Sequence, residues 1–223
     1  MWNYIGVQTL TEHLIEQGLS EKVLSERQLE RAVGGAAARR YGLVNRALKA
    51  QELIRIRRGL YTLPSKYRTE PPHPFAIAQA LEPGSYVSFE TALSTHGWIP
   101  EAVRVTASVV PGRKSSHLEH PSLGSFEFRP LALHQEHFLE LIERRQLGSQ
   151  IALLAHPLRA LIDLVTFRKL DWHGLSGLTD GMRIDEQKLR DITRTQIQTL
   201  ARVYKQKRPN SFLSALGREL DLD

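Results

Sequence analysis

The amino-acid sequence predicts an α+β protein of two domains, with a boundary near residue 68. The segment 65–74 holds three prolines and few apolar residues, which is typical of a linker. Residues 1–68 show helical apolar spacing followed by one alternating hairpin. Residues 69–223 show short β-branched strands among helices, which is typical of a mixed α/β domain.

Apolar spacing predicts the first helix over residues 7–17, and Gly18 ends it. Ser25 begins the second helix as its N-cap, and Gln28 completes a capping box three residues later. The turn Gly34–Gly35 ends this helix.

The third helix is expected from about residue 36 to residue 50, and a basic hairpin is expected over residues 53–63. Gly42 lies in the middle of this helix and costs about 1 kcal/mol. Its buried stripe is predicted as Ala37, Tyr41, Val44 and Leu48, and its outward face as Arg39, Gly42, Arg46 and Lys49. In the hairpin, Arg58 and Gly59 supply the turn.

The second domain is expected to contain helices over residues 75–81, 89–97, 155–167 and 211–220, with one helix or a pair over 185–207. Strands are expected over residues 103–110 and 124–129, and residues 86–89 either begin a strand or lead directly into a helix. Residues 111–123 are expected to form a polar loop.

Composition excludes several classes of protein. Of the 223 residues, 41% are hydrophobic and 24% are charged, which is ordinary for a globular chain. The absence of cysteine excludes a disulfide scaffold, a thiolate metal site and a cysteine nucleophile. No apolar run approaches the roughly 18–20 residues of a membrane helix, and we expect no signal peptide over residues 1–10. We therefore expect a cytoplasmic protein with no membrane partner.

The positive charge lies in the first third of the chain. The net charge is +6, and residues 1–68 carry all of it, with 12 Lys and Arg against 6 Glu. Residues 31–68 hold ten of these cations against the single acid Glu52. Solvated faces usually mix both signs, so this excess indicates a polyanionic partner, most often nucleic acid.

Two helices, a tight glycine turn, a third helix and a basic hairpin follow the order of a winged helix-turn-helix. Such a third helix enters the major groove of DNA, and its hairpin contacts the backbone or the minor groove. Arginine reads guanine with its fork, so Arg39 and Arg40 are candidate base readers, and Asn45 is a candidate for adenine. The predicted phosphate contacts are Arg46, Lys49, Arg55, Arg57 and Arg58. Protein contact is the alternative role for such a module.

Four stretches resemble the AbiEi-type antitoxins of bacterial abortive-infection (type IV) toxin–antitoxin systems. Residues 57–61 end the hairpin as in that family, and residues 86–100 (YVSFETALSTHGWIP) look like its helix after the linker. The strand within 103–113 and the stretch 156–163 (HPLRALID) follow in the expected places. The resemblance spans roughly residues 20–170, and the C-terminal third matches only loosely.

The resemblance implies a DNA-binding antitoxin of a phage-defence system that represses transcription of its own toxin–antitoxin operon. Residues 1–68 would bind inverted repeats in the promoter of the protein's own operon, as a dimer or as a pair of monomers. Residues 69–223 would counter a nucleotidyltransferase-like toxin, either directly or without a stable complex. In this interpretation the protein is not an enzyme and needs no cofactor.

Other groups of polar residues give weaker indications of a functional site. The pairs His117/His120 and His134/His137 lack carboxylates or thiols at ligand spacing, so we expect no metal site. Ser88, Glu90, Ser94 and His96 lack a nucleophile elbow, so we expect no catalytic residue among them. Arg159 and Asp163 share a helix face as an ion pair or packing anchor, with a role in toxin antagonism as the alternative.

Two further functions stay open. One is a winged-helix transcription regulator whose second domain senses a ligand or dimerises, without a toxin. The other is a nucleic-acid-processing enzyme targeted by the winged helix, with Lys114, Glu127 and Asp163 as its candidate nuclease residues. The net +5 of residues 183–208 indicates a solvated helix face, a second nucleic-acid surface or a contact for an acidic toxin.

Overall fold

The computed structural model describes residues 9–222, and it divides the chain into two compact units. The first unit consists of residues 1–81 together with 146–151, and the second consists of residues 82–145 and 152–223. Both units combine helices with a β-sheet, so the protein is of the α+β class. No helix in the described part of the chain has both the length and the apolar character that crossing a membrane demands.

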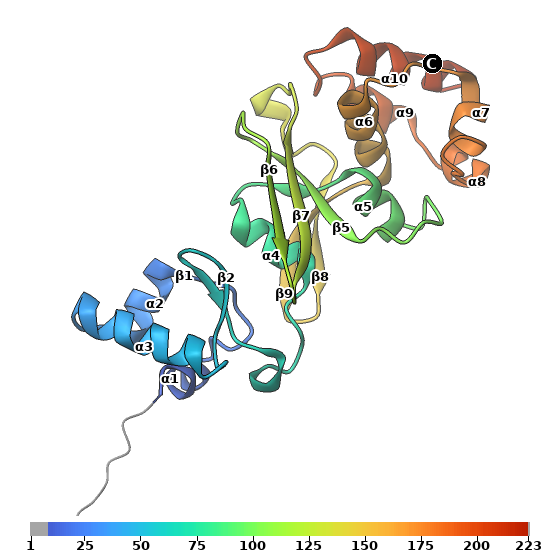
Figure 1. The fold of residues 1–223 in the computed structure, drawn as a ribbon. Coiled ribbons are helices and arrows are strands. Elements are labelled where there is room, and N and C mark those ends of the chain that lie inside the picture. Colours follow the sequence, from blue (N-terminus) through green and yellow to red (C-terminus); the bar gives the residue numbers. More distant parts are fainter. Residues whose placement is uncertain (1–8, 223) are drawn as a thin grey trace, which may run out of the picture. The chain divides into compact units, whose positions relative to one another are not determined.

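The first unit places helices around a small sheet (Figure 1). Its three strands are antiparallel in the order β1-β3-β2, so the strand between the first two helices pairs with the return strand of the hairpin. The elements are α1 (Leu10–Glu16), β1 (Leu24–Ser25), α2 (Glu26–Val33), α3 (Ala37–Lys49), β2 (Ile54–Arg57), β3 (Leu60–Thr62), a 3-10 turn (Ser65–Tyr67) and α4 (Pro74–Leu81).

Local sequence signals explain where these elements begin. Thr9 and Glu12 form a capping box at the start of α1, which begins at Leu10; residues 7 and 8 of the expected helix lie outside the described residues. The capping box of Ser25 and Gln28 is confirmed at α2. The core is made mainly of leucines from α1, β1, α2 and the chain around β3, namely Leu10, Leu14, Leu24, Leu29, Leu53 and Leu63 with Ala47 and Tyr61.

The predicted buried stripe of α3 is wrong in its first half. Tyr41 is 73% exposed, and Ala37 is exposed as well. Ala47 is the buried residue of the helix, while Val44 and Leu48 are only partly buried. Ala37, Tyr41 and Val44 line a pocket together with Leu29 and Val33 of α2. Helical spacing grouped these residues on one side but did not show that the space beside them is left open.

The boundary between the units differs from the expected division at residue 68. The first unit continues through α4 and includes residues 146–151, far along the chain. The reason is local: the proline-rich segment is bound by hydrogen bonds from both sides and is not a free linker. Proline and polar content identified an irregular segment here but not its contacts.

The second unit holds most of a six-stranded sheet in the order β6-β7-β5-β4-β9-β8, and its later helices gather at one end (Figure 1). The β5–β7 and β4–β9 pairs are parallel, while β4–β5 and β6–β7 are antiparallel. The strands are β4 (Tyr86–Val87), β5 (Val105–Val110), β6 (Ser116–His120), β7 (Gly124–Pro130), β8 (Ile142–Leu147) and β9 (Gln150–Ala155). The helices are α5 (Phe89–Thr95), α6 (Pro157–Arg168), α7 (Gly174–Thr179), α8 (Glu186–Arg190), α9 (Arg194–Leu200) and α10 (Lys207–Glu219), with a 3-10 turn at Gln135–His137.

The expected polar loop over residues 111–123 is wrong, because it contains strand β6. Strands β1, β8 and β9 and helix α7 were not expected from the sequence either. Strands β6 and β8 are the two edges of the sheet and carry polar or charged residues, as edge strands commonly do. Such strands have little apolar alternation, so the periodicity that identified β5 and β7 is missing from them.

Helix α6 is the centre of the second unit. Every residue from Pro157 to Thr166 is buried, and the helix packs against α5 and α10. A helix that is buried on all sides must bury its polar residues too, and α6 therefore encloses one arginine and one aspartate.

Candidate nucleic-acid interface

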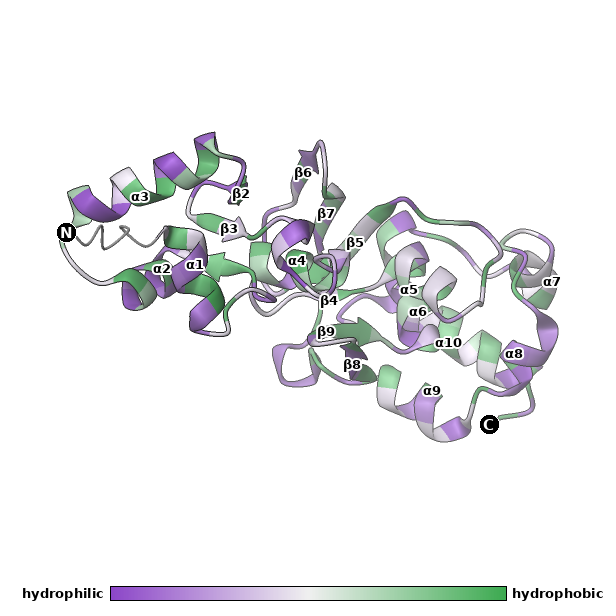
Figure 2. Ribbon diagram, turned by 90° about the horizontal axis from the view of Figure 1, so that it is seen from below, coloured by the Kyte–Doolittle hydropathy of each residue, from purple (hydrophilic) through white to green (hydrophobic). Residues whose placement is uncertain are grey.

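Helix α3 presents cations on its outward side. Arg39, Arg46 and Lys49 are exposed, and Asn45 is half-buried. Figure 2 shows hydrophilic segments recurring along this helix between hydrophobic ones. The helix has no acidic residue in its first turn and two cations in its last. Its outward side therefore attracts anions along most of its length.

Arg40 lies differently from its expected place as a base reader. Its guanidinium forms an ion pair with Glu30 of α2 and donates a hydrogen bond to the carbonyl of Gly35. Its side chain is 22% exposed. The charge of Arg40 is thus directed at α2 and at the turn before α3, away from the outward side of the helix.

The hairpin carries three exposed arginines. Arg55 and Arg57 lie on β2 and Arg58 lies at the turn, while β3 behind them is fully buried. Gly59 has a φ of +78°, which an L side chain rarely adopts, so glycine is needed to close the turn. A bulge between Arg55 and Arg57 shifts the register, and Arg57 also donates to the carbonyl of Leu81. The hairpin thus presents cations on the exposed face of β2 and at its turn.

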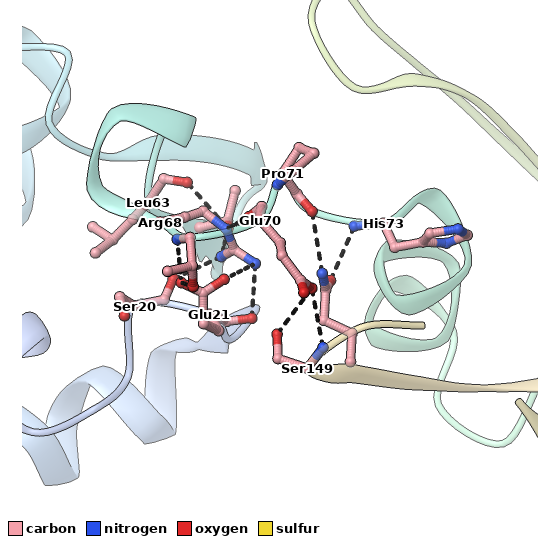
Figure 3. A network of polar contacts seen from close by, with 11 residues as sticks. Ser20, Glu21, Leu63, Arg68, Glu70, Pro71, His73 and Ser149 are labelled. Atoms are coloured by element: carbon pink, nitrogen blue, oxygen red, sulfur yellow. Dashed lines mark hydrogen bonds and ion pairs between the residues drawn. The ribbon is translucent and has the colours of Figure 1, made fainter. Parts of the chain in front are cut away.

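Arg68 holds the start of the polar segment in place (Figure 3). Its side chain is fully buried and donates to the carbonyl oxygens of Ser20, Glu21 and Glu70, at distances of 2.7, 2.8 and 3.0 Å. Burial lowers the pKa of Arg68, and the nearby carboxylates partly offset this effect. Burial alone raises the pKa of Glu21, but hydrogen bonds from Thr69 and the charge of Arg68 leave that pKa below its usual value.

The other end of the segment is held by the β8–β9 turn (Figure 3). The carboxylate of Glu70 accepts from the backbone N–H of Ser149 at 3.0 Å. Gln150 is buried, donates to the carbonyl of Pro71 at 3.1 Å and accepts from the N–H of His73 at 2.9 Å. The basic segment that carries the candidate interface therefore ends in a fixed polar anchor.

Replacing Arg68 with alanine is expected to lower the free energy of unfolding by about 2–4 kcal/mol, because three partly buried carbonyls lose their donor and Glu21 loses its ion-pair partner. Chemical denaturation of the full chain, followed by circular dichroism, measures the change. Lys66→Ala in the neighbouring exposed turn is the matched control, and we expect less than about 0.5 kcal/mol from it. Equal losses in the two variants would show that Arg68 anchors nothing.

The second unit contains a buried polar network around Asp163 of α6. One carboxylate oxygen accepts from Arg159 at 3.0 Å and from the hydroxyl of Tyr204 at 2.8 Å. The other accepts from Tyr86 at 3.0 Å and from Ser88 at 2.7 Å. Arg159 also donates to the carbonyl of Glu140 at 3.0 Å. The pair Arg159 and Asp163 is completely buried.

Charges in this network are strongly coupled. Burial raises the pKa of Tyr86 and of Tyr204, and the charge of Asp163 raises both further. Burial lowers the pKa of Arg159, but the carboxylate of Asp163 together with Tyr204 and Tyr86 more than offsets burial, so that pKa ends above its usual value. The tyrosines therefore stay neutral donors and Arg159 stays charged at any ordinary pH, which suits a structural centre.

The predicted i,i+4 contact of Arg159 and Asp163 is present, but both side chains lie inside the unit. Sequence reasoning did not find Tyr86 and Tyr204, which come from β4 and from the chain after α9. No spacing rule connects them to α6, and only the apolar character of their neighbours indicated that they would be buried. With all four of its acceptor directions used, Asp163 lacks room for a metal ion or a partner protein.

The remaining candidates are dispersed. Glu127 pairs with Arg129. The four histidines of the two pairs each have a different partner: His117 contacts Glu119, His120 accepts from the N–H of Ser122, His134 contacts Glu136 and His137 contacts Glu140. Among residues 9–222, no group of three His, Asp or Glu side chains could hold a metal ion. Of the residues Ser88, Glu90, Ser94 and His96, Ser88 donates to Asp163 and His96 contacts the carbonyl of Ala155.

The basic C-terminal stretch 183–208 is partly neutralised within the second unit. Arg183 pairs with Glu101, Arg190 with Glu186 and Arg208 with Asp171. Arg202, Lys205 and Lys207 are exposed around the junction of α9 and α10. This stretch is thus a set of helix faces with mixed charge and one small cationic group.

No model of a known protein family matches the sequence, and none of the curated proteins matches it.

Proposed function

We propose that the first unit is a winged helix-turn-helix that binds double-stranded DNA. The order α1-β1-α2-α3-β2-β3 and the pairing of β1 with β3 support this assignment. The helix after the turn, α3, corresponds to the recognition helix, and β2 and β3 correspond to the wing.

The observation that carries the proposal is the placement of the exposed cations. Arg39, Arg46 and Lys49 lie on the outward side of α3, and Arg58 lies at the tip of the hairpin. Two elements that would touch DNA in one docking geometry thus carry the same sign of charge. Phosphate contacts of this kind position a protein on the duplex, while side chains near the start of the helix read bases.

Two sets of variants test this assignment. Arg39→Ala is expected to relax the base preference at particular positions of the site, because a guanine-reading contact contributes about 1–3 kcal/mol of discrimination. Arg55→Ala with Arg58→Ala is expected to weaken binding to all duplexes about equally. Selection from a random duplex library by the full chain, followed by titration of the selected and scrambled duplexes, measures both effects.

Absence of any preferred duplex for the unmodified chain would refute sequence-specific DNA binding. An unchanged affinity in the hairpin variant would remove the hairpin from the interface. Neither result depends on the identity of the natural operator.

We further propose an autorepressor and antitoxin of the AbiEi type, which rests on the motif resemblance of residues 57–61, 86–100 and 156–163. The operator would be two-fold, and the second unit would counter a nucleotidyltransferase-like toxin. Growth rescue by the full chain, co-expressed with a toxin from the neighbouring gene, tests this role. Because Arg159 and Asp163 are buried, their part in antagonism would be to maintain the fold of the second unit.

A further inference from the structure

The first half of the proposed recognition helix has little packing to hold it. The N-cap of α3, Ala36, has no side-chain oxygen and makes no capping hydrogen bond. Ala37, Ala38 and Arg39 are all exposed. The helix follows Gly34 and Gly35, whose φ values of +61° and +72° are ones that glycine adopts far more readily than other residues. Neither capping nor burial therefore fixes the direction of the first turn.

A cavity of about 160 Å³ separates this half of α3 from α2. Leu29, Val33 and Val44 give this cavity an apolar lining, and Glu30 and Arg40 add one charged pair. In a well-packed pair of helices such a space is filled by side chains. Here the space beside Ala37 and Tyr41 of α3 is left open, although Leu29 and Val33 of α2 face it.

Arg40 provides the link across this gap. Its guanidinium joins the carboxylate of Glu30 on α2, ten residues earlier, and the carbonyl of Gly35 in the turn. One side chain thus fixes the helix both to the preceding helix and to the turn that sets its direction. Because Glu30 lies on α2, substituting it breaks the ion pair and leaves every cation of α3 in place.

We infer that Glu30 and Arg40 form a clamp that positions the start of α3 for base reading, so Glu30 is a positioning residue for sequence preference. The inference rests on the proposed DNA binding and deepens it. It assigns Arg40 a role through Glu30 in place of direct contact with a base. The clamp acts on the ratio of affinities for preferred and scrambled DNA, because phosphate contacts tolerate a small shift of the helix and base contacts do not.

Glu30→Gln separates the clamp from general electrostatics, because charge alone leaves the ratio of the two affinities unchanged and the clamp predicts that this ratio falls. Removing an acid near a polyanion strengthens binding if charge alone matters. With the clamp, affinity for the selected duplex relative to the scrambled duplex is expected to fall about fivefold or more, while affinity for scrambled DNA stays level or rises. Fluorescence anisotropy of the full chain with both duplexes, at one fixed salt concentration, gives this ratio.

Glu26→Gln, one turn earlier on α2, is the matched control for the loss of one acid, and its ratio is expected to stay unchanged. The double variant Glu30→Arg with Arg40→Glu restores an ion pair with the two charges exchanged. We expect it to recover part of the lost preference for the selected duplex over the scrambled duplex. A ratio for Glu30→Gln within about twofold of the unmodified chain, at well-measured affinity, overturns the clamp. Failure of the unmodified chain to prefer any selected duplex refutes DNA recognition itself, which is a different result.

Discussion

Replacing Asp163 with alanine is expected to lower the free energy of unfolding of the second unit by about 3–5 kcal/mol. The change leaves the buried charge of Arg159 without a counter-ion and removes the acceptor of Tyr86, Ser88 and Tyr204. Each donor left unpaired in the interior adds its own cost. Chemical denaturation followed by tryptophan fluorescence measures the effect, since Trp98 and Trp172 both lie in this unit.

The chain offers a matched control with the same spacing. Arg190 and Glu186 also form an i,i+4 ion pair, but their side chains are 70% and 55% exposed. Glu186→Ala is expected to cost no more than about 0.5 kcal/mol, because exposed pairs contribute little. If both substitutions had similar small effects, the buried network would not be the centre of the second unit. A second variant, Asp163→Asn, keeps the shape and removes the charge, which isolates the electrostatic part.

Binding of the full chain to duplex DNA is expected to weaken with salt, with a slope of log K against log salt of roughly −5 for about six phosphate contacts. The triple variant Arg46→Ala, Lys49→Ala and Arg58→Ala removes three cations that lie exposed on α3 and at the hairpin turn. We expect the slope to become shallower by about 2.7. Titrations at four salt concentrations measure both slopes.

The same number of charges can be removed elsewhere as a control. Arg202, Lys205 and Lys207 lie exposed in the second unit, and their triple alanine variant is expected to keep the original slope. Equal changes in the two triple variants would mean that DNA responds to net charge and not to α3 and the hairpin. A change only in the second variant would transfer the nucleic-acid surface to the C-terminal stretch.

Sequence reasoning succeeded where one local pattern decides the structure. The capping box of Ser25 and Gln28, the glycine turn before α3 and the alternation of the hairpin depend on residues close in the chain. It failed at Tyr41, because helical periodicity tells which residues share a side but not whether a neighbouring helix fills the space beside them. It also failed at β6, whose polar residues pair only because β7 lies beside them.

The candidate sites show the same division. The i,i+4 spacing of Arg159 and Asp163 predicted their contact, since it is fixed within one helix. Their burial depends on tyrosines from two other elements and could not be read from spacing. Likewise, the cation content of residues 31–68 indicated a polyanion surface, but only the fold shows that Arg40 faces Glu30 while Arg39 is exposed.

The first unit is completed by residues made much later in translation. Glu70, Pro71 and His73 find their hydrogen-bond partners at Ser149 and Gln150, nearly eighty positions further along the chain. When α4 has been synthesised, every helix of this unit has therefore been made, but the β8–β9 turn has not. The hydrogen bonds to Ser149 and Gln150 can form only after the β8–β9 turn has left the ribosome, so the polar anchor is the last part of this unit to be completed.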